Sequence, residues 1–208
     1  MFNTKKNLRG GGAILAAVLF ALICFYTSNV RAQVTCGSVP DCISDPWNGP
    51  YLITINVDNG CGNGGTCPIN IAYCTRFSCG SLYDVEIIGL SYVGGCFCDD
   101  GTSGPTNRAI QQFITTNAAG FPCPTCPDLA NHYRFFINAC SHYTSYTDPQ
   151  GHLEYGQVFC DNTNAWCVSG WDACCDGTGY HISNFSTWTL GDPTSCDNGT
   201  CTSNCPTW

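Results

Sequence analysis

Charged side chains are scarce in this sequence. They make up 11% of its 208 residues, whereas about one quarter is typical of globular domains. Residues 33–208 contain no lysine and no methionine, and their only fixed cations are Arg76, Arg108 and Arg134, against all 15 acidic residues of the chain. Such an acidic surface repels phosphate backbones, which excludes nucleic acid as a partner. The lack of lysine also excludes catalysis through a Schiff base.

Recognisable catalytic and metal-binding motifs are missing as well. The sequence has no GxSxG elbow, no HExxH pair and no glycine-rich phosphate loop. Asp58-Asn59-Gly60 and Asp99-Asp100-Gly101 lack the spaced ligands of a calcium loop and are typical of tight turns. We therefore expect no metal and no cofactor, and a non-catalytic role is favoured over an enzyme. None of the four histidines has a partner at the spacing of metal ligands; they are His132, His142, His152 and His181.

Residues 1–32 have the pattern of an export signal. Lys5, Lys6 and Arg9 precede an apolar run from Ala13 to Tyr26, and small residues lead up to an expected cleavage after Ala32. The run is shorter than the ~20 residues that span a bilayer, and no second apolar stretch follows. We expect a secreted or cell-surface protein without a membrane span. A lipoprotein signal at Cys24 or a prepilin-type leader is a less favoured alternative.

The 18 cysteines that follow the leader predict a disulfide framework of up to nine bridges. Structural zinc is less favoured because only one CxxC spacing occurs, and zinc knuckles come in pairs. Spacing alone predicts local bridges: Cys61 with Cys67, Cys36 with Cys42, and pairs within Cys196, Cys201 and Cys205.

The single CxxC, Cys123 to Cys126, also has the spacing of a redox pair. A redox-active pair opens a helix whose N-terminus stabilises the thiolate, but here Pro122, Pro124 and Pro127 surround the cysteines. The prolines favour a structural role, with Cys123 and Cys126 bonded either to each other or to distant partners.

Alternating apolar residues predict strands, and one 3.6-residue pattern predicts a helix that ends at Gly120. The fold class that follows is mainly β with one helix (α+β), a disulfide-rich antiparallel sheet or small sandwich. We expect one domain over 33–190 and a cysteine-rich appendage over 191–208. The predicted segments are strands over 51–58, 68–74, 82–92 and 180–190, and a helix that Gly104-Pro105-Thr106 introduces and Gly120 ends.

The turn Asp148-Pro149-Gln150-Gly151 predicts a hairpin between strands 133–146 and 152–160. A type I turn followed by left-handed Gly151 would place His152 opposite Asp148. In that register Cys140 falls opposite Cys160, which predicts a cross-strand disulfide, although at a hydrogen-bonded position that suits disulfides less well.

The tryptophans are expected mainly to be buried and to pack on disulfides, and a sugar-binding aromatic surface is the less favoured alternative. For that alternative the candidate ligand-binding pair is Trp166 and Trp171, which lie in a loop with Gly170. Asn184 and Asn198 each begin a glycosylation sequon. The sequence as a whole predicts an exported structural or adhesive module at the cell surface, in extracellular matrix or in a filament. Its expected partners are further copies of itself or an extracellular glycan or protein. The alternatives are a carbohydrate-binding module and a secreted enzyme of unknown class.

Overall fold

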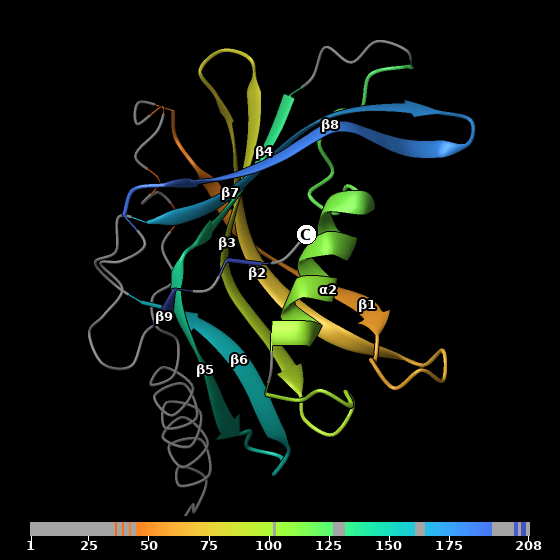
Figure 1. Ribbon diagram of the computed structural model, residues 1–208, viewed down its shortest axis with the longest axis vertical. Helices are drawn as coiled ribbons and strands as arrows, with labels where there is room; N and C mark the ends of the chain where they lie inside the picture. Colours follow the sequence, from red (N-terminus) through yellow and green to blue (C-terminus); the bar gives the residue numbers. More distant parts are fainter. Residues whose placement is uncertain are drawn as a thin grey trace, which may run out of the picture. The chain divides into compact units, whose positions relative to one another are not determined.

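In the residues that the structure describes, the fold is mainly β with one helix, as predicted (Figure 1). The computed structural model describes residues 36, 39, 42, 45–101, 103–126, 132–160, 165–192, 202–203 and 205–206. Its strands form one sheet in which all pairs but one are antiparallel, so the sandwich alternative does not apply. The elements are β1 (Asn48–Asp58), β2 (Thr66–Ser78), β3 (Leu82–Val93), α2 (Ser103–Thr115), β4 (His132–Asn138), β5 (Cys140–Thr147), β6 (Leu153–Phe159), β7 (Trp166–Asp176), β8 (Gly179–Leu190) and β9 (Thr202–Ser203).

Strand β3 is the branch point of the sheet. One of its edges pairs with β2, and the other pairs with β4 over Leu82–Ile87 and with β6 over Leu90–Val93. From β4 the sheet continues through β7 to β8, and from β6 it continues through β5 to β9. The two arms are seen at the top and the bottom of Figure 1. The β3–β4 pair is parallel because α2 crosses between the two strands.

Helix α2 covers one face of the sheet with the apolar side that its sequence pattern predicted. Phe113 contacts Tyr73 of β2 and Phe135 of β4, with ring centroids 5.1 and 6.4 Å apart. The helix ends at Thr115 rather than near Gly120, because Asn117 takes a left-handed φ of 49° and its backbone N–H bonds to Ile114. The face opposite α2 carries a second, smaller cluster of Phe136, Trp166, Val168 and Val39.

The alternating pattern located β1, β2, β3 and β8, but it missed β7. Almost every residue of Trp166–Cys175 is buried, so polar and apolar residues do not alternate along this strand. Trp166 and Trp171 are 2% and 6% exposed, so they are buried, as the favoured interpretation of the tryptophans predicted, and the alternative of an exposed pair is wrong. The predicted strand over 133–146 is divided at Ala139, where the chain leaves β3 and pairs with β6 instead.

The predicted hairpin register is confirmed for β5 and β6, from Ser141 opposite Phe159 to Thr147 opposite Leu153. Gly151 has a φ of 89°, as the turn required. Cys140 and Cys160 are both disulfide-bonded, but the predicted bond between them is not among the disulfides seen in the described residues. The backbone N–H of Cys160 donates to the oxygen of Cys140 at 3.0 Å, so the pair occupies the wider, hydrogen-bonded position.

Six of the seven disulfides between described residues form three doublets, each of which is two bonds between the same two segments. The first joins the segment before β1 to β2 and the residue after it. The second joins the β1–β2 region to the segment after β3, and the third joins the segment after α2 to β7. The doublets are Cys36–Cys74 with Cys42–Cys79, Cys61–Cys98 with Cys67–Cys96, and Cys123–Cys175 with Cys126–Cys174.

The local pairs Cys61–Cys67 and Cys36–Cys42 are thus wrong, because sheet formation brings distant segments together. The backbone N–H of Cys98, for example, donates to Asn59 at 3.0 Å, which places the segment after β3 against the β1–β2 loop. Cys123 and Cys126 were expected to bond either to each other or to distant partners, and the structure bonds each to a distant partner.

The seventh disulfide, Cys167–Cys205, and the pairing of β9 with β5 attach described parts of 191–208 to the sheet. The predicted leader over 1–32, and Cys196, Cys201 and Asn198, lie outside the described residues. The one helix of the described chain is too short and too polar to cross a bilayer.

Candidate functional site

A groove of about 220 Å³ lies between β3, β4, β7 and β8. Arg134 and Gly170, which form a register pair of β4 and β7, belong to its lining. On β4, Arg134 alternates with Tyr133 and Phe135, whose side chains lie in the core cluster that packs with α2. The groove therefore opens on the sheet face opposite the helix. Its lining is Leu82, His132, Tyr133, Arg134, Gly170, Trp171, Asp172, Asn184, Ser186 and Trp188.

Trp188 forms an aromatic wall of the groove. It is 39% exposed, a high value for so large an apolar side chain. Gly170 makes room for its ring, since a Cβ at that position would lie 2.9 Å from the Trp188 atoms Cη2 and Cζ3. The missing side chain on β7 thus allows the indole of β8 to lie over the strand.

A β-bulge between β7 and β8 brings Asn184 into the groove. The register moves between Gly170 opposite Ser186 and Asp172 opposite Ser183, so β8 has one extra residue there. Asn184 has a left-handed φ of 51°, a conformation that asparagine tolerates better than most residues. Its Nδ2 donates to Asp172 Oδ2 at 2.6 Å.

Asp172 is the polar centre of the groove, because its other oxygen, Oδ1, is paired with Nδ1 of His132. The β4–β7 register places His132 directly opposite Asp172. The His132 side chain is 55% exposed and that of Asp172 only 14%. One shielded carboxylate therefore fixes both an imidazole and an amide that face solvent.

Arg134 supplies a cation that is already paired with a buried carboxylate. Its Nε and Nη2 donate to the two oxygens of Asp84 at 2.8 Å each, and Arg76 Nε donates to the same carboxylate at 2.9 Å. The fully buried carboxylates Asp84 and Glu86 lie on the same face of β3. Two guanidinium groups thus bond to one buried carboxylate, and the arginine of the groove lining is already paired.

Of the two predicted site tryptophans, the structure brings only Trp171 to the groove. Trp171 stacks between Tyr133 and Phe185, at centroid distances of 5.8 and 6.5 Å, and its Nε1 donates to the Tyr180 hydroxyl at 3.0 Å. Burial raises the pKa of Tyr180 to about 12. Trp171 thus supports the groove from within, whereas Trp166 packs in the separate cluster of Phe136 and Val168.

The exposed tryptophan of the groove, Trp188, was placed in a strand by the sequence but was not recognised as a site residue. Its exposure depends on Gly170, which lies 18 positions away and opposes β8 only through strand pairing. Asn184 was noted only for its sequon. The available signal was a tryptophan in a strand that is polar on both faces, which is typical of an exposed edge.

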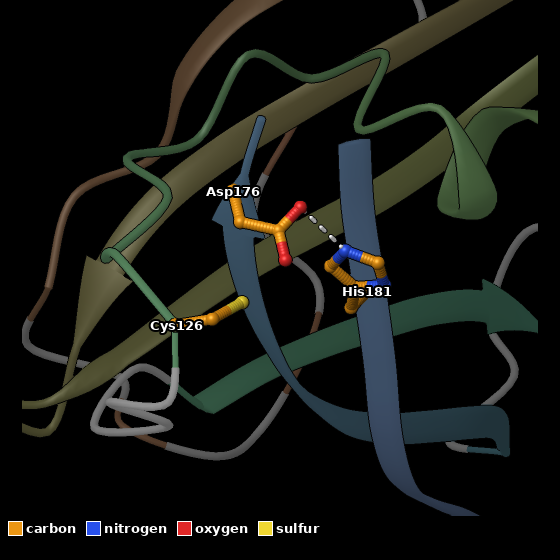
Figure 2. A group of neighbouring side chains, drawn as sticks. All are labelled: Cys126, Asp176 and His181. Atoms are coloured by element: carbon orange, nitrogen blue, oxygen red, sulfur yellow. Dashed lines mark hydrogen bonds and ion pairs between the residues drawn. The ribbon is translucent and has the colours of Figure 1, made fainter. Parts of the chain in front are cut away.

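A second group, Cys126, Asp176 and His181, lies at the β7–β8 turn (Figure 2). The sulfur of Cys126 is bonded to Cys174, so it is not a free thiolate ligand. Hydrogen bonds from the Thr178 hydroxyl and from His181 lower the pKa of the Asp176 carboxyl. The hydroxyl and the carboxylate both contact the same nitrogen, Nε2 of His181, whereas a catalytic triad uses one ring nitrogen for each. This geometry is that of a turn network.

Comparison with known proteins does not classify the chain: no family model, no curated protein and no solved structure matches it.

Proposed function

We propose that this protein is an exported adhesive module that binds an extracellular partner in the groove beside Trp188. A disulfide-rich β-sheet without a membrane-spanning helix in its described residues fits an extracellular module. The observation that carries the finer proposal is the half-exposed indole next to a fixed polar pair, Asp172 and Asn184. Pockets that bind ligands combine an aromatic or apolar surface with a few well-placed polar groups.

The framework supports this role because it holds the groove rigid. The backbone N–H of Cys175 donates to Pro124 at 2.8 Å, and that of Cys126 donates to Cys175 at 3.1 Å, so the segment after α2 is hydrogen-bonded to β7 as well as disulfide-bonded to it. Strand β7 also carries Gly170 and Asp172. A binding site whose supporting strand does not move loses less entropy when it binds.

Self-association is a second candidate, favoured by the outer edge of β8. Among the described strands, β8 pairs only with β7, and Phe185 and Trp188 are exposed along it. Its 12 residues include no proline and no lysine, the residues that commonly protect an edge strand. Pairing of two β8 edges would give a dimer or a filament, and size-exclusion chromatography with light scattering distinguishes this assembly from a monomeric adhesin.

Replacing Trp188 with alanine should strongly weaken adhesion. We expect at least a tenfold loss of binding of the purified secreted protein to cell-surface material from the producing organism, measured by surface plasmon resonance. The loss follows from removal of the aromatic wall. The matched control is Phe77→Ala, which removes an aromatic ring that is 51% exposed outside the groove and should leave binding unchanged. Equal binding by both variants would contradict the proposal.

A further inference from the structure

We infer that the ligand of the groove is a neutral carbohydrate, whose ring packs on Trp188 while its hydroxyls bond to the polar centre formed by Asp172, Asn184 and His132. This inference rests on the proposed function and specifies its ligand class. Three features of the groove lead to it: the form of the aromatic wall, the number of unused donors and acceptors, and the charge.

The aromatic wall suits a ring that has one apolar face. An indole presents a flat, rigid surface at small conformational cost, and Trp188 keeps 39% of its surface exposed although Gly170 lies beneath its ring. A pyranose presents C–H groups on one face and hydroxyls around its edge. It can therefore cover the indole while its hydroxyls reach the polar groups beside it.

The polar centre has hydrogen-bonding capacity left for such hydroxyls. A carboxylate accepts about four hydrogen bonds, and Asp172 receives one at each oxygen, from His132 and from Asn184. Asn184 retains its amide oxygen and a second N–H, and His132 retains Nε2. Vicinal hydroxyls both donate and accept, which matches this mixture of acceptors and donors better than a purely acidic or purely basic ligand does.

The charge of the groove disfavours an anionic ligand. Arg134 is the only fixed cation in the lining, and Asp84 accepts hydrogen bonds from it and from Arg76. The third arginine after the leader, Arg108, is paired with Asp99 at 2.8 Å on another part of the chain. The lining also holds the carboxylate of Asp172, so an anionic ligand would meet a carboxylate and an arginine that is already paired. Sialylated, sulfated and phosphorylated ligands are therefore disfavoured.

The size of the groove limits what it holds. Its volume of about 220 Å³ is below the ~300–1,000 Å³ of pockets that enclose drug-sized ligands. The groove fits one sugar ring, such as a terminal residue of a surface glycan, and the rest of the glycan would extend into solvent.

A glycan array that carries neutral, sialylated and sulfated oligosaccharides tests the ligand class. The protein should be made in a bacterial periplasm, because N-glycosylation at Asn184 would replace one of its two Nδ2 protons and attach a glycan to a residue of the groove lining. We expect binding to neutral glycans, a loss of at least tenfold in Trp188→Ala and partial retention in Trp188→Phe, which keeps a flat ring. Phe77→Ala should bind like the wild type.

Asp172→Asn gives an independent readout, because it keeps the shape of the side chain and removes its charge. This variant should bind neutral glycans several-fold more weakly and should discriminate less against acidic glycans. A wild-type preference for acidic glycans would overturn the inference, as would a Trp188→Ala variant that keeps its neutral-glycan signal.

Periodate oxidation of the cell-surface material separates failure of this inference from failure of the proposed function. If adhesion depends on Trp188 but survives oxidation and the array is negative, the ligand is not a carbohydrate, although the groove still mediates adhesion. If Trp188→Ala changes no binding at all, both proposals are wrong.

Discussion

Removing both bonds of the doublet Cys123–Cys175 and Cys126–Cys174 should destabilise the protein by more than the two single removals together. Either bond alone closes a loop of about 50 residues in the unfolded chain, with sequence separations of 52 and 48. Chain-entropy arguments assign such a loop about 4 kcal/mol. Once one bond is formed, however, the second closes only a ring of a few residues, for which the same relation gives about 2 kcal/mol.

The expected losses in free energy of unfolding are therefore about 2 kcal/mol for either serine pair and about 6 kcal/mol for the fourfold serine variant. Urea unfolding of the wild type, the two single-bond variants and the fourfold variant forms a complete cycle in which the single-bond variants control for each other. Additive losses would show that the two bonds act independently. The fourfold variant should also lose adhesion at a lower urea concentration than the other variants, because strand β7 carries the groove residues Gly170 and Asp172.

The doublets explain why disulfide pairing could not be predicted from spacing. Each doublet closes a contact that exists only once the sheet has formed, such as the contact of the β1–β2 loop with the segment after β3. Spacing favours near neighbours such as Cys61 and Cys67, whereas every disulfide between described residues joins cysteines at least 29 positions apart. The number of cysteines predicted the framework correctly, but their positions carried no information on partners.

Some strands could likewise be predicted from their local sequence, whereas others depend on neighbours that are distant in the sequence. Strands β1, β2 and β3 have alternating residues because one of their faces packs against α2, and that alternation is visible in the sequence. Strand β7 lies between β4 and β8 and is buried on both faces, so its sequence of small and aromatic residues predicted a loop instead. The hairpin register was predictable because it depends only on the four-residue turn at Asp148.

The candidate site lay beyond sequence reasoning for a related reason. Gly170 was noted, but as a loop residue beside Trp166 and Trp171, the candidate exposed pair. In the structure it is a strand residue that makes room for Trp188 across the β7–β8 pair. Trp166 and Trp171 were considered as an exposed pair because strand β7 was missed, and the exposed tryptophan of the groove lies on β8 instead.

Replacing Asp84 with asparagine should greatly lower the free energy of unfolding. Asp84 has no exposed surface, and the guanidinium groups of Arg76 and Arg134 both bond to it, with side chains that are 1% and 12% exposed. The Ser78 hydroxyl donates to the same carboxylate at 2.7 Å. Asparagine would leave two buried cations without this counter-charge, and breaking a buried ion pair in this way costs about 3–5 kcal/mol.

Asp99→Asn is the matched control, because it breaks the other arginine–aspartate pair of the described chain. The side chains of Arg108 and Asp99 are 26% and 33% exposed, and exposed pairs contribute about 0–1 kcal/mol. Urea unfolding should therefore separate the two variants by several kcal/mol, with Asp84→Asn at or near the limit of folding. Equal midpoints would mean that the buried cluster contributes no more than a surface pair.

The same cluster connects stability to binding, because Arg134 lies in the groove. Any folded fraction of Asp84→Asn would present an Arg134 guanidinium that has lost its carboxylate partner, next to Trp188 and Asp172. The groove would then carry a more positive charge, and acidic glycans should bind to this variant better than to the wild type on the same array. If folded Asp84→Asn still discriminates against acidic glycans as the wild type does, the discrimination comes from Asp172 alone. In that case Asp172→Asn should remove all of this discrimination.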